Sequence, residues 1–586
     1  MVNYAIDDIK VENTDSGYHV HVKGWVLSKD YQVVVKDGSK EIYRFCGSQK
    51  RYDICIAYHV DITEDNYGFD VEFDVPKECE LIEFKYVIND AEKRFYTVAL
   101  DNKKHHQETL NNLSDSIKRS LKNEWETNGF KLPVGRLVKG FFKSIFQKPH
   151  DRIFNPNDDE QYHEWLKIQK YKKNKFKDYT IVHEGEVLHL DAISNNYICF
   201  VGENCELYPE FEWYIGECVN YDVLYFDHDE HRSKPMFKPD YSFDTLQSVN
   251  YIGHVFVVKK ELLKEYDGKK IDLYSCLLSL SEKTESFGHV SKVLYSDSSD
   301  VEYNESNDVL KEHPLVSIII PTKDHVDDLN TCITSIQKKS SYQDYEIIVV
   351  NNNSEKEESF KYFHELNKQE NIQVIDLNCE FNFSYLNNYA VKNCSKGEYV
   401  LMLNNDTEVV SSDWLEQMLI YASKDGVGSV GAFLMFPDNT IQHAGIIMGK
   451  GGIAGHAYSG VSVDTEGYGY SLKAPYDVSC CTAACLMCSK KKYLEVGGLD
   501  EELKVAFNDV DFGLKLLEAG YRNVFLPHVK LYHYESKSRG MDKSAEQLTR
   551  YYSECDTMKE RWNQYIEKDP FYNENFSRDD DYLLHE

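Results

Sequence analysis

The chain has 586 residues, a length that suits roughly three to five domains, each able to bury its own core. Its formal net charge of −32 argues against a duplex nucleic-acid binder, whose surface would be basic. It contains no apolar run of about eighteen residues, so we expect no membrane-spanning helix. Its N-terminus lacks the basic start and apolar core of a signal peptide, so we expect none.

The fifteen cysteines lack the spacing of a disulfide framework, which fits free thiols in a reducing cytoplasm. A cluster at Cys480, Cys481, Cys485 and Cys488 raises the alternative of a metal site. Residues three apart on a strand point to opposite faces, which is poor geometry for zinc. We therefore interpret these cysteines as small, buried apolar residues.

Residues 1–104 alternate apolar and polar side chains with a period of two. The alternation is clear at 18–22, 69–75 and 82–88, and Asp37-Gly38 supplies a hairpin turn. Short alternating strands at this spacing predict an N-terminal β-sandwich. Its aromatic residues allow two interpretations, a platform that binds sugars or the filling of a small core. The domain is thus a candidate carbohydrate-binding or interaction module.

Residues 105–160 read as a helical linker in which the sign of the charge reverses. Eight basic side chains lie between Lys118 and Lys148, and the apolar residues Phe141, Phe142, Ile145 and Phe146 recur at helical spacing. A basic amphipathic helix suits the anionic head groups of a membrane surface. The alternative is a linker helix whose apolar stripe packs between domains.

Residues 161–300 look like a shortened copy of the C-terminal part of the chain. Three pairs of segments match in the same order: 195–207 with 397–409, 251–262 with 482–494, and 288–295 with 527–532. Such ordered matches favour an internal duplication. The copy has Asn204 in place of Asp406, no counterpart of the later acidic pair, and little chain before residue 195 for a nucleotide-binding half. We expect a catalytically inactive repeat.

Residues 312–575 alternate strands and helices, which predicts a parallel sheet covered by helices. Predicted strands lie at 316–320, 345–350, 373–375 and 399–403, with helices that include 328–338 and 385–393. Polar residues follow the strands at 321–324, 351–354 and 404–406. In an open α/β sheet, ligands bind at the carboxyl ends of the strands.

The polar strand ends fit the chemistry of a nucleotide diphosphate. Asparagine side chains and backbone amides can hydrogen-bond a base and ribose, whereas two phosphates need a cation. Mg²⁺ or Mn²⁺ prefers oxygen ligands such as the carboxylate of Asp406. The asparagines by themselves could be ordinary turn residues, but their combination with Asp406 favours a nucleotide-sugar site.

Six segments of this region resemble a known family: 316–324, 381–388, 403–408, 441–445, 506–511 and 532–536. In these segments, the region from Val316 to about Asn575 closely resembles the inverting family 2 glycosyltransferases of GT-A fold. It is most similar to those of bacterial O-antigen, rhamnan and capsular polysaccharide synthesis. The middle region resembles the degenerate first copy of tandem members at 237–241 and 250–253. The resemblance implies a multidomain protein with a Rossmann-like, GT-A catalytic domain behind a degenerate GT-A-like repeat.

The resemblance also implies roles for single residues. Asp406 would bind Mn²⁺ or Mg²⁺ as the last residue of a DxD-like triplet, and His533 would complete the metal shell. Asp509 would be the catalytic base, with Asp511 as the alternative. The nucleotide-sugar site would comprise Pro321, Thr322, Asp324, Asn351, Asn352, Asn382, Asn387, Asn404 and Asn405. The acceptor or donor-sugar region would include His443, Thr482 and Asn508.

Two positions depart from the family pattern. Asn351 stands where many members carry the aspartate that recognises the base, and Asn508 replaces the glutamate of the usual Glu-Asp pair. Asp509 also has a structural interpretation, because acidic residues stabilise the start of a helix. Capping and catalysis are compatible at one residue.

The expected reaction is a single in-line displacement at the anomeric carbon, with Asp509 as general base. A retaining double displacement needs a second carboxylate nucleophile, for which the sequence offers no clear candidate. Two alternatives remain: a non-catalytic scaffold that binds glycans, and a sugar nucleotidyltransferase, which would need a glycine-rich loop that 321–324 lacks.

The expected partners follow from this reaction. They are a nucleotide-diphosphate sugar donor of dTDP or UDP type and a lipid-linked glycan acceptor, with rhamnose as the sugar that the resemblance implies and no nucleic acid. We expect a cytoplasmic protein at the inner face of the cell membrane, with peripheral contact through 118–148.

Overall fold

The computed structural model describes residues 4–14, 17–26, 32–37, 40–46, 68–76, 81–88, 91–99, 153–171, 175–304, 308–534 and 545–585. The chain forms two compact units, residues 1–153 with 542–552 and residues 154–541 with 553–586. Among the described helices, none is both long and apolar enough to cross a membrane. The predicted basic helix at 118–148 lies outside the described residues.

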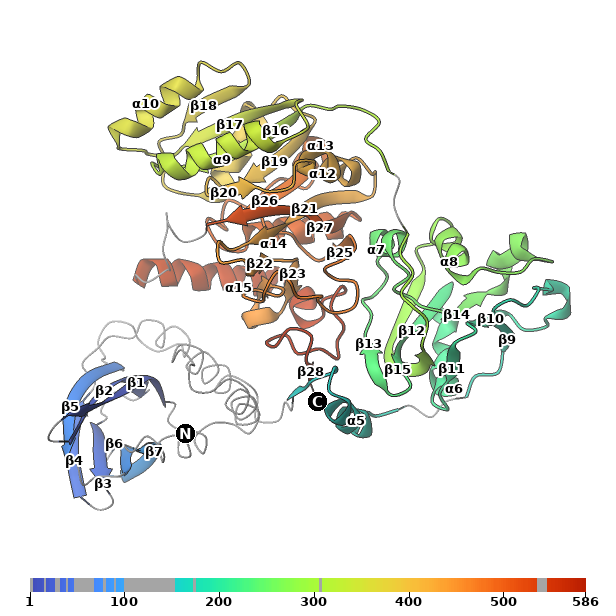
Figure 1. Cartoon of the computed structure of the whole chain (residues 1–586), viewed down its shortest axis with the longest axis horizontal. Helices are drawn as coiled ribbons and strands as arrows, with labels where there is room; N and C mark the ends of the chain where they lie inside the picture. The colour runs from blue at the N-terminus through green and yellow to red at the C-terminus, as the bar shows by residue number, and fades with distance from the viewer. Residues whose placement is uncertain are drawn as a thin grey trace. The chain divides into compact units, whose positions relative to one another are not determined.

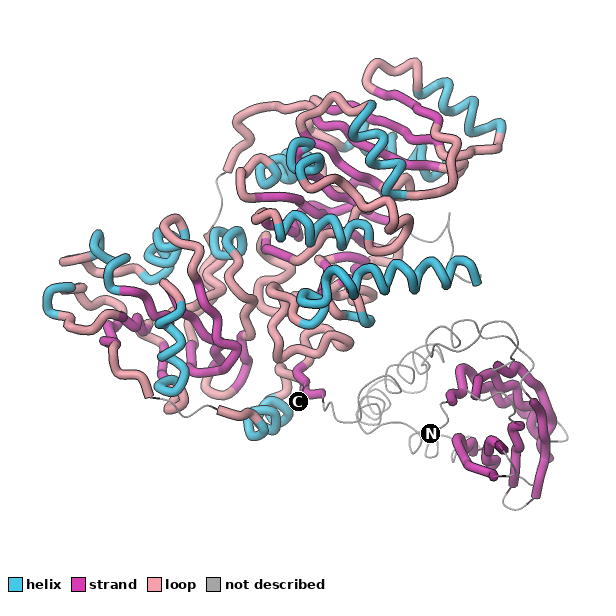
Figure 2. The backbone as a smooth tube through the Cα atoms, turned by 180° about the vertical axis from the view of Figure 1, so that it is seen from behind, coloured by secondary structure: helices cyan, strands magenta, loops and turns pink. Residues whose placement is uncertain are grey.

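In the first unit, the described part of residues 1–99 consists of strands (Figure 2). They are β1 (Tyr4–Thr14), β2 (Gly17–Val26), β3 (Gln32–Asp37), β4 (Lys40–Cys46), β5 (Gly68–Pro76), β6 (Leu81–Ile88) and β7 (Ala91–Ala99). They pair into two antiparallel sheets, of order β1-β2-β5 and β4-β3-β6-β7.

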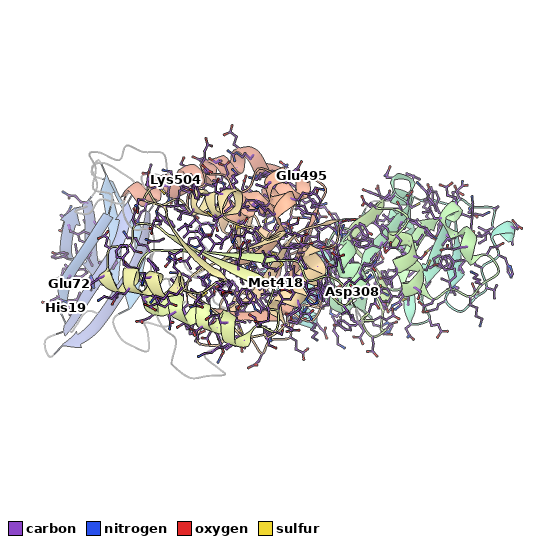
Figure 3. The ribbon with its side chains drawn as sticks, turned by 90° about the horizontal axis from the view of Figure 1, so that it is seen from above. His19, Glu72, Asp308, Met418, Glu495 and Lys504 are labelled. Atoms are coloured by element: carbon purple, nitrogen blue, oxygen red, sulfur yellow. The ribbon has the colours of Figure 1, made fainter. Side chains whose placement is uncertain are left out.

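Alternation along these strands separates a buried face from a polar one. Val20 and Val22 of β2 are buried, whereas His19 of the same strand faces Glu72 of β5 with 3.7 Å between Nε2 and Oε2 (Figure 3). The Phe73 ring of one sheet stacks on the Tyr43 ring of the other at 4.9 Å between centroids. The period-two pattern read from the sequence therefore places apolar side chains between two sheets.

The second unit contains two α/β sheets (Figure 1). The strands of the middle region are β9 (Tyr179–His183), β10 (Tyr197–Val201), β11 (Cys205–Leu207), β12 (Val223–Glu230), β13 (Ser233–Met236), β14 (Val255–Lys259) and β15 (Phe287–Asp297). Its helices are α5 (Asp159–Ile168), α6 (Phe211–Tyr214), α7 (Phe243–Ser248) and α8 (Leu273–Ser281), with 3-10 turns η1 (Leu190–Ala192), η2 (Ile215–Asn220) and η3 (Lys260–Tyr266). A short strand, β8 (Ile153–Phe154), precedes α5.

The C-terminal region carries the larger sheet. Its strands are β16 (Val316–Thr322), β17 (Tyr345–Asn351), β18 (Ile372–Asp376), β19 (Tyr399–Leu403), β20 (Thr407–Val409), β21 (Val427–Met435), β22 (Ile441–His443), β25 (Tyr476–Val478), β26 (Cys485–Ser489) and β27 (Arg522–His533). β23 (Ile446–Met448) pairs separately with β24 (Ala454–His456), and β28 (Leu584–His585) ends the described chain. The four strands predicted at 316–320, 345–350, 373–375 and 399–403 are confirmed as β16 to β19, all in parallel pairs.

Helices cover both faces of this sheet. They are α9 (Val326–Lys339), α10 (Glu357–Leu366), α11 (Phe383–Asn393), α12 (Trp414–Ala422), α13 (Lys490–Glu495) and α14 (Asn508–Glu518). A 3-10 turn, η4 (Lys450–Gly452), and a last helix, α15 (Ala545–Glu567), complete the region. The predicted helices 328–338 and 385–393 are thus confirmed as α9 and α11. α9 buries Leu329, Ile333 and Ile336 at helical spacing against one face, whereas α11 and α14 pack in the core cluster on the other.

The two sheets share one strand order. The middle sheet runs β11-β15-β12-β14-β10-β9, and the C-terminal sheet runs β20-β27-β21-β26-β19-β16 before it continues to β17 and β18. Strand directions agree as well: β12 is parallel to β15 and antiparallel to β14, as β21 is to β27 and β26. This agreement favours the duplication inferred from the sequence, with counterparts of β17 and β18 absent from the described middle sheet.

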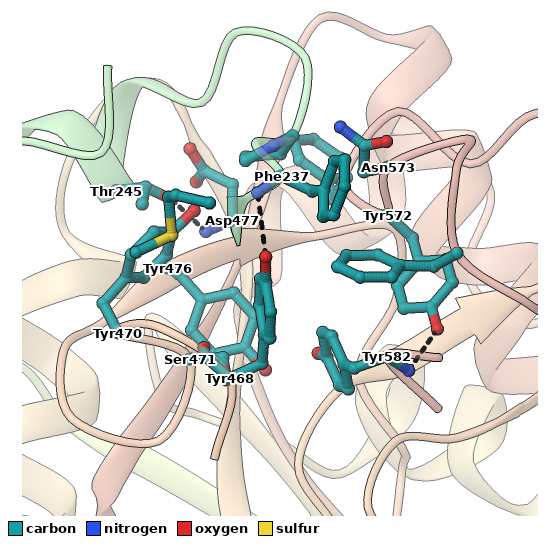
Figure 4. A pocket seen from close by; sticks show the side chains of 14 residues that line it. Phe237, Thr245, Tyr468, Tyr470, Ser471, Tyr476, Asp477, Tyr572, Asn573 and Tyr582 are labelled. Carbon is teal, nitrogen blue, oxygen red and sulfur yellow. Dashed lines mark hydrogen bonds between the residues drawn. The ribbon is translucent and has the colours of Figure 1, made fainter. Parts of the chain in front are cut away.

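The two repeats pack against each other through polar and aromatic contacts. Arg522 Nε donates to Asp244 Oδ2 at 2.6 Å, and the Asp244 amide donates to Asp477 Oδ2 at 3.0 Å. Beside them, aromatic side chains from both repeats and from the C-terminal segment enclose a cavity of about 40 Å³ (Figure 4). There Tyr468 accepts a hydrogen bond from the Phe237 amide at 2.9 Å. The second unit is therefore one packed body.

Candidate functional site

The predicted metal residues Asp406 and His533 meet at one corner of the C-terminal sheet. Thr407, which follows Asp406, pairs with His533 across β20 and β27, and the Tyr534 amide donates to the Asp406 carbonyl at 2.9 Å. This register brings His533 Nε2 to 3.2 Å from Asp406 Oδ1. Both side chains are largely buried, at 9% and 7% exposure. An imidazole nitrogen and a carboxylate oxygen therefore converge on one point.

Neighbouring amides fix the orientation of the histidine. His533 Nδ1 lies 2.6 Å from Gln442 Oε1, and Asn404 Nδ2 lies 3.1 Å from His533 Nε2. A neutral imidazole that donates through Nδ1 to Gln442 presents a lone pair on Nε2, the arrangement that a metal-binding histidine needs. Gln442 lies in the segment 441–445 that carries the family resemblance, but it is not among the predicted site residues.

The carboxyl ends of β16, β17 and β18 form the adjacent edge. Asn405 Nδ2 donates to Thr322 Oγ1 at 3.0 Å, which links the end of β19 to the end of β16. Asn351 ends β17, is 2% exposed, and donates to Asp376 Oδ1 at 2.7 Å. Asp376 ends β18 and is exposed. Asp376 is not among the predicted site residues, although its position directly after the third predicted strand was the available signal.

Asp324 and Asn352 hold the loops of this edge in place. Asp324 Oδ1 accepts hydrogen bonds from the amides of Glu355 and Lys356 and from Ser359 Oγ. Burial alone would raise the pKa of Asp324, but these hydrogen bonds hold it below its usual value. Asn352 donates to the Leu377 and Cys379 carbonyls at 2.9 and 3.0 Å. Both side chains are thus committed to loop structure, and Pro321 lies within β16 beside Val350.

Asp509 lies in the first turn of α14 and contacts Ala483, beside the segment that pairs with Asn404. Its Oδ2 accepts from the Ala483 amide at 3.0 Å and its Oδ1 from the Val510 amide at 2.9 Å. Ala484 in turn accepts the Asn404 amide at 3.0 Å, which connects Asp509 to the segment that carries Asp406. Asp509 is half-buried, so the carboxylate is fixed yet open on one side.

Strained backbone and a buried glutamate set the start of α14. Phe507, the residue before the helix, has φ of 61°, a left-handed value that costs a side-chain-bearing residue on the order of 1–3 kcal/mol. Glu554 of α15 accepts the amides of Val505 and Ala506 at 3.0 and 3.1 Å. Two oriented hydrogen bonds therefore hold the loop that positions Asp509. Glu554 lies far away in the sequence and was not predicted.

Asp511, the alternative base, has a different environment. Its side chain is 1% exposed, with Lys515 Nζ at 2.9 Å, and its Oδ1 accepts from Trp562 Nε1 at 3.0 Å. Arg561 Nη1 lies at 3.5 Å from the same carboxylate. A carboxylate enclosed by two cations and an indole is a structural ion pair, so the geometry favours Asp509 as the base.

Several predicted site residues are structural in this fold. Asn382 caps α11, accepting from the Tyr385 amide at 3.0 Å, and donates to the Glu501 carbonyl at 2.8 Å. Asn387 is fully buried inside the same helix and donates to the Phe383 carbonyl at 2.8 Å. Asn508 is 4% exposed and faces the Leu503 and Val505 carbonyls. The pattern of asparagines was read as a ligand surface, but these three satisfy backbone groups.

The two other residues of the predicted sugar region differ from each other. His443 is fully buried, with Nδ1 at 2.8 Å from His456 Nδ1, and burial together with His456 and His533 holds its pKa well below its usual value. It therefore cannot contact an acceptor in this conformation, which corrects that prediction. Thr482 is half-buried beside Ala483 and remains available to a ligand.

Comparisons with known proteins agree with the geometry. Residues 317–487 match the model described as glycosyl transferase family 2. The chain is 36% identical to the uncharacterized protein y4gI of Sinorhizobium fredii over 62% of its own length and 46% of that protein. It is 33% identical to the O-antigen biosynthesis protein RfbC of Myxococcus xanthus over 55% of its length and 29% of that protein.

A shorter match links the chain to a protein of Mycobacterium tuberculosis, the N-acetylglucosaminyl-diphospho-decaprenol L-rhamnosyltransferase. The identity is 31% over 11% of this chain and 21% of that one. The chain spans less than half the length of each of these curated relatives. The match to the glycosyl transferase family 2 model lies in the C-terminal α/β region, on the segment that carries Asp406.

Proposed function

We propose that the C-terminal domain is a metal-dependent, inverting glycosyltransferase that transfers a sugar from a nucleotide diphosphate to a hydroxyl of a lipid-linked glycan. The observation that carries the proposal is the convergence of Asp406 Oδ1 and His533 Nε2, 3.2 Å apart, beyond the carboxyl end of β19 and at that of β27 in a mixed α/β sheet. In such sheets the carboxyl ends of the strands are where ligands bind.

The donor set at this corner fits Mn²⁺ or Mg²⁺. Asp406 supplies a carboxylate oxygen, His533 a neutral imidazole nitrogen oriented by Gln442, and a diphosphate would supply further oxygens. A bound divalent cation offsets the negative charge that develops on a departing diphosphate. Imidazole as a ligand favours Mn²⁺ over Mg²⁺ at this position.

Side chains of the protein are proposed to bind the donor, to orient the reacting groups and to accept the proton of the acceptor. The edge formed by Thr322, Asn351 and Asp376 is proposed to hold the base and ribose, with Asp376 replacing the carboxylate that Asn351 lacks. Asp509 accepts the proton of the acceptor hydroxyl as that oxygen attacks the anomeric carbon. Its two amide hydrogen bonds keep the carboxylate in one orientation before the acceptor arrives.

The other domains are proposed to support this reaction. The two antiparallel sheets of residues 1–104 would form a β-sandwich that binds glycan or a partner protein. The middle repeat, residues 161–300, would bind no nucleotide sugar, because Asn204 replaces Asp406 and the described sheet has no strands beyond β9. The stretch 118–148 is proposed to bring the enzyme to lipid-linked acceptors at the inner face of the membrane.

The decisive experiment is release of nucleoside diphosphate from a panel of UDP-, dTDP- and GDP-sugars with Mn²⁺ or Mg²⁺ and a lipid-linked acceptor. We propose dTDP-rhamnose as the first donor to test, because one relative is described as an L-rhamnosyltransferase. Turnover that requires the cation and is lost in Asp406→Ala supports the proposal. Silence across the panel in protein that melts cooperatively would favour a non-catalytic scaffold that binds glycans.

A further inference from the structure

The middle repeat preserves the backbone of the corner that carries Asp406 and His533. The Gly202 amide donates to the His254 carbonyl at 2.9 Å, as the Asn404 amide donates to the Ala484 carbonyl at 3.0 Å. The Asn204 carbonyl accepts the Ser298 amide at 3.3 Å, as the Asp406 carbonyl accepts the Tyr534 amide at 2.9 Å. Residues 202–204 therefore correspond to 404–406 in structure as well as in sequence.

Strand register identifies the remaining counterparts. Cys205 pairs with Asp297 across β11 and β15, as Thr407 pairs with His533 across β20 and β27. His254 directly precedes β14, the counterpart of β26. The corner that holds Asp406 and His533 in the C-terminal domain thus holds a thiol, an imidazole and a carboxylate in the middle repeat.

These three groups are close enough to share one ion. One ligand atom each from Cys205, His254 and Asp297 lies within 4.8 Å of the others, and Asp297 is buried. His254 Nδ1 lies 2.8 Å from Asp297 Oδ2, while its Nε2 faces Glu302 Oε2 at 3.2 Å. A histidine that binds a metal through one nitrogen and donates its other N–H to a carboxylate is the usual arrangement around zinc.

Small residues and oriented partners build this corner. A Cβ added to Gly202 would lie 2.6 Å from His254 Cβ and 3.2 Å from Cys205 Sγ, so only glycine leaves room for both ligands. Asn250 Nδ2 donates to Glu302 Oε2 at 2.8 Å, and Asn250 Oδ1 accepts the Gly253 amide at 3.0 Å. The outer carboxylate and the turn that carries His254 are therefore fixed by the same side chain.

We propose that Cys205, His254 and Asp297 form a zinc-type transition-metal site in the middle repeat, with water as the fourth ligand and Glu302 as the carboxylate behind the histidine. A thiolate and an imidazole select Zn²⁺ or Co²⁺ over the Mg²⁺ that oxygen ligands prefer. The thiolate and carboxylate together carry two negative charges, which neutralise a divalent ion. The ion would link β11, the turn before β14 and the end of β15. Its proposed role is therefore to stabilise the middle repeat, in which we expect no nucleotide sugar to bind.

The test is a Co²⁺ titration of the full chain, followed by its sulfur-to-metal charge-transfer absorption. Wild-type protein is expected to give a saturable band that stoichiometric Zn²⁺ removes. Cys205→Ser should lose the band. Cys394→Ser is the matched control, since Cys394 is a free cysteine of similar exposure in the C-terminal domain, and it should keep the band.

A second variant separates loss of a ligand from loss of fold. Glu302→Gln leaves all three ligands in place and should weaken Co²⁺ binding about 10- to 100-fold. Circular dichroism and thermal melting of each variant establish that it is folded. Zn²⁺ should raise the melting temperature of wild type but not of Cys205→Ser. A band that is absent in wild type, or that survives in Cys205→Ser, would overturn the site and leave only a hydrogen-bonded Asp297–His254–Glu302 cluster.

Discussion

Replacing Asp509 by asparagine separates its catalytic role from its structural one. The side chains are nearly isosteric, but an amide cannot take the acceptor proton. Loss of a positioned general base typically costs about 100- to 10,000-fold in rate, or roughly 3–5 kcal/mol of barrier. Donor binding should be unchanged, because Asp509 contacts the Ala483 and Val510 amides and not the nucleotide edge.

The structural cost of this change should be small. An asparagine keeps one acceptor for the two amides, so one hydrogen bond to a charged group is lost, worth about 1.5–3 kcal/mol when fully buried. Asp509 is half-exposed, which lowers that figure toward 1 kcal/mol, and the favourable charge at the start of α14 adds about 0.3–1 kcal/mol. The total of about 1–2 kcal/mol corresponds to a melting shift of a few degrees.

Asp511→Asn is the matched control, two residues along the same helix. Removing its charge takes a shared carboxylate from Lys515 and Arg561, whose side chains are 24% and 35% exposed. Because solvent reaches both cations and Arg561 keeps Asp500 as a partner, the expected cost is below the about 3–5 kcal/mol of breaking a fully buried pair. The test is to measure diphosphate release, donor binding by calorimetry and thermal unfolding for both variants. Near wild-type transfer by Asp509→Asn, or normal melting with loss of transfer in Asp511→Asn, would contradict the assignment of Asp509 as the base.

Three further predictions follow from the described contacts and the sequence. Asp406→Ala should abolish cation-dependent turnover while the melting temperature stays within a few degrees; full activity in the presence of chelator would remove the metal assignment. Burial and the neighbouring Asp244 raise the pKa of Asp477 well above its usual value. Because the folded state then holds this proton to higher pH than the unfolded chain, stability from this group falls as pH rises from about 4 through the raised pKa. Asp477→Asn should flatten that slope in urea unfolding series, and an unchanged slope would contradict the assignment. Reversing three lysine charges within 118–148 should abolish salt-sensitive sedimentation with anionic vesicles, since each basic group near the surface contributes about 1 kcal/mol; unchanged sedimentation would favour a linker helix packed between domains.

The local pattern of apolar and polar residues was sufficient to predict the first four strands of the C-terminal domain and the two helices α9 and α11. Continuous apolar runs such as 316–320 and 345–350 can be satisfied only by strands covered on both faces, and both strands form as predicted. Asp406 was accessible from sequence as the acidic residue after a predicted strand, whereas the metal role of His533, the last residue of β27, came from the family resemblance. Asp406 and His533 lie close together although they are far apart in the sequence, because the pairing of β20 with β27 brings them to one corner.

Asparagine roles could not be read from sequence. The same amide side chain can cap a helix, as Asn382 does, or bind His533, as Asn404 does. Only the backbone groups around each one decide between these uses. The burial of His443 and the contact of its neighbour Gln442 with His533 also depend on strand packing, because adjacent residues on a strand point to opposite sides.

The sequence by itself predicted the parallel strands β16 to β19 and the acidic residue after β19, and its ordered matches favoured a duplication that the shared strand order of the two sheets also favours. Tertiary structure alone decided which carboxylate is enclosed by cations, at Asp511, and which stays open, at Asp509. It also brought Asp376 beside Asn351, Glu554 beneath the loop before α14, and Cys205 beside His254 and Asp297. These pairings join residues up to about a hundred positions apart, and their distances follow from sheet register and helix packing, which no local periodicity encodes.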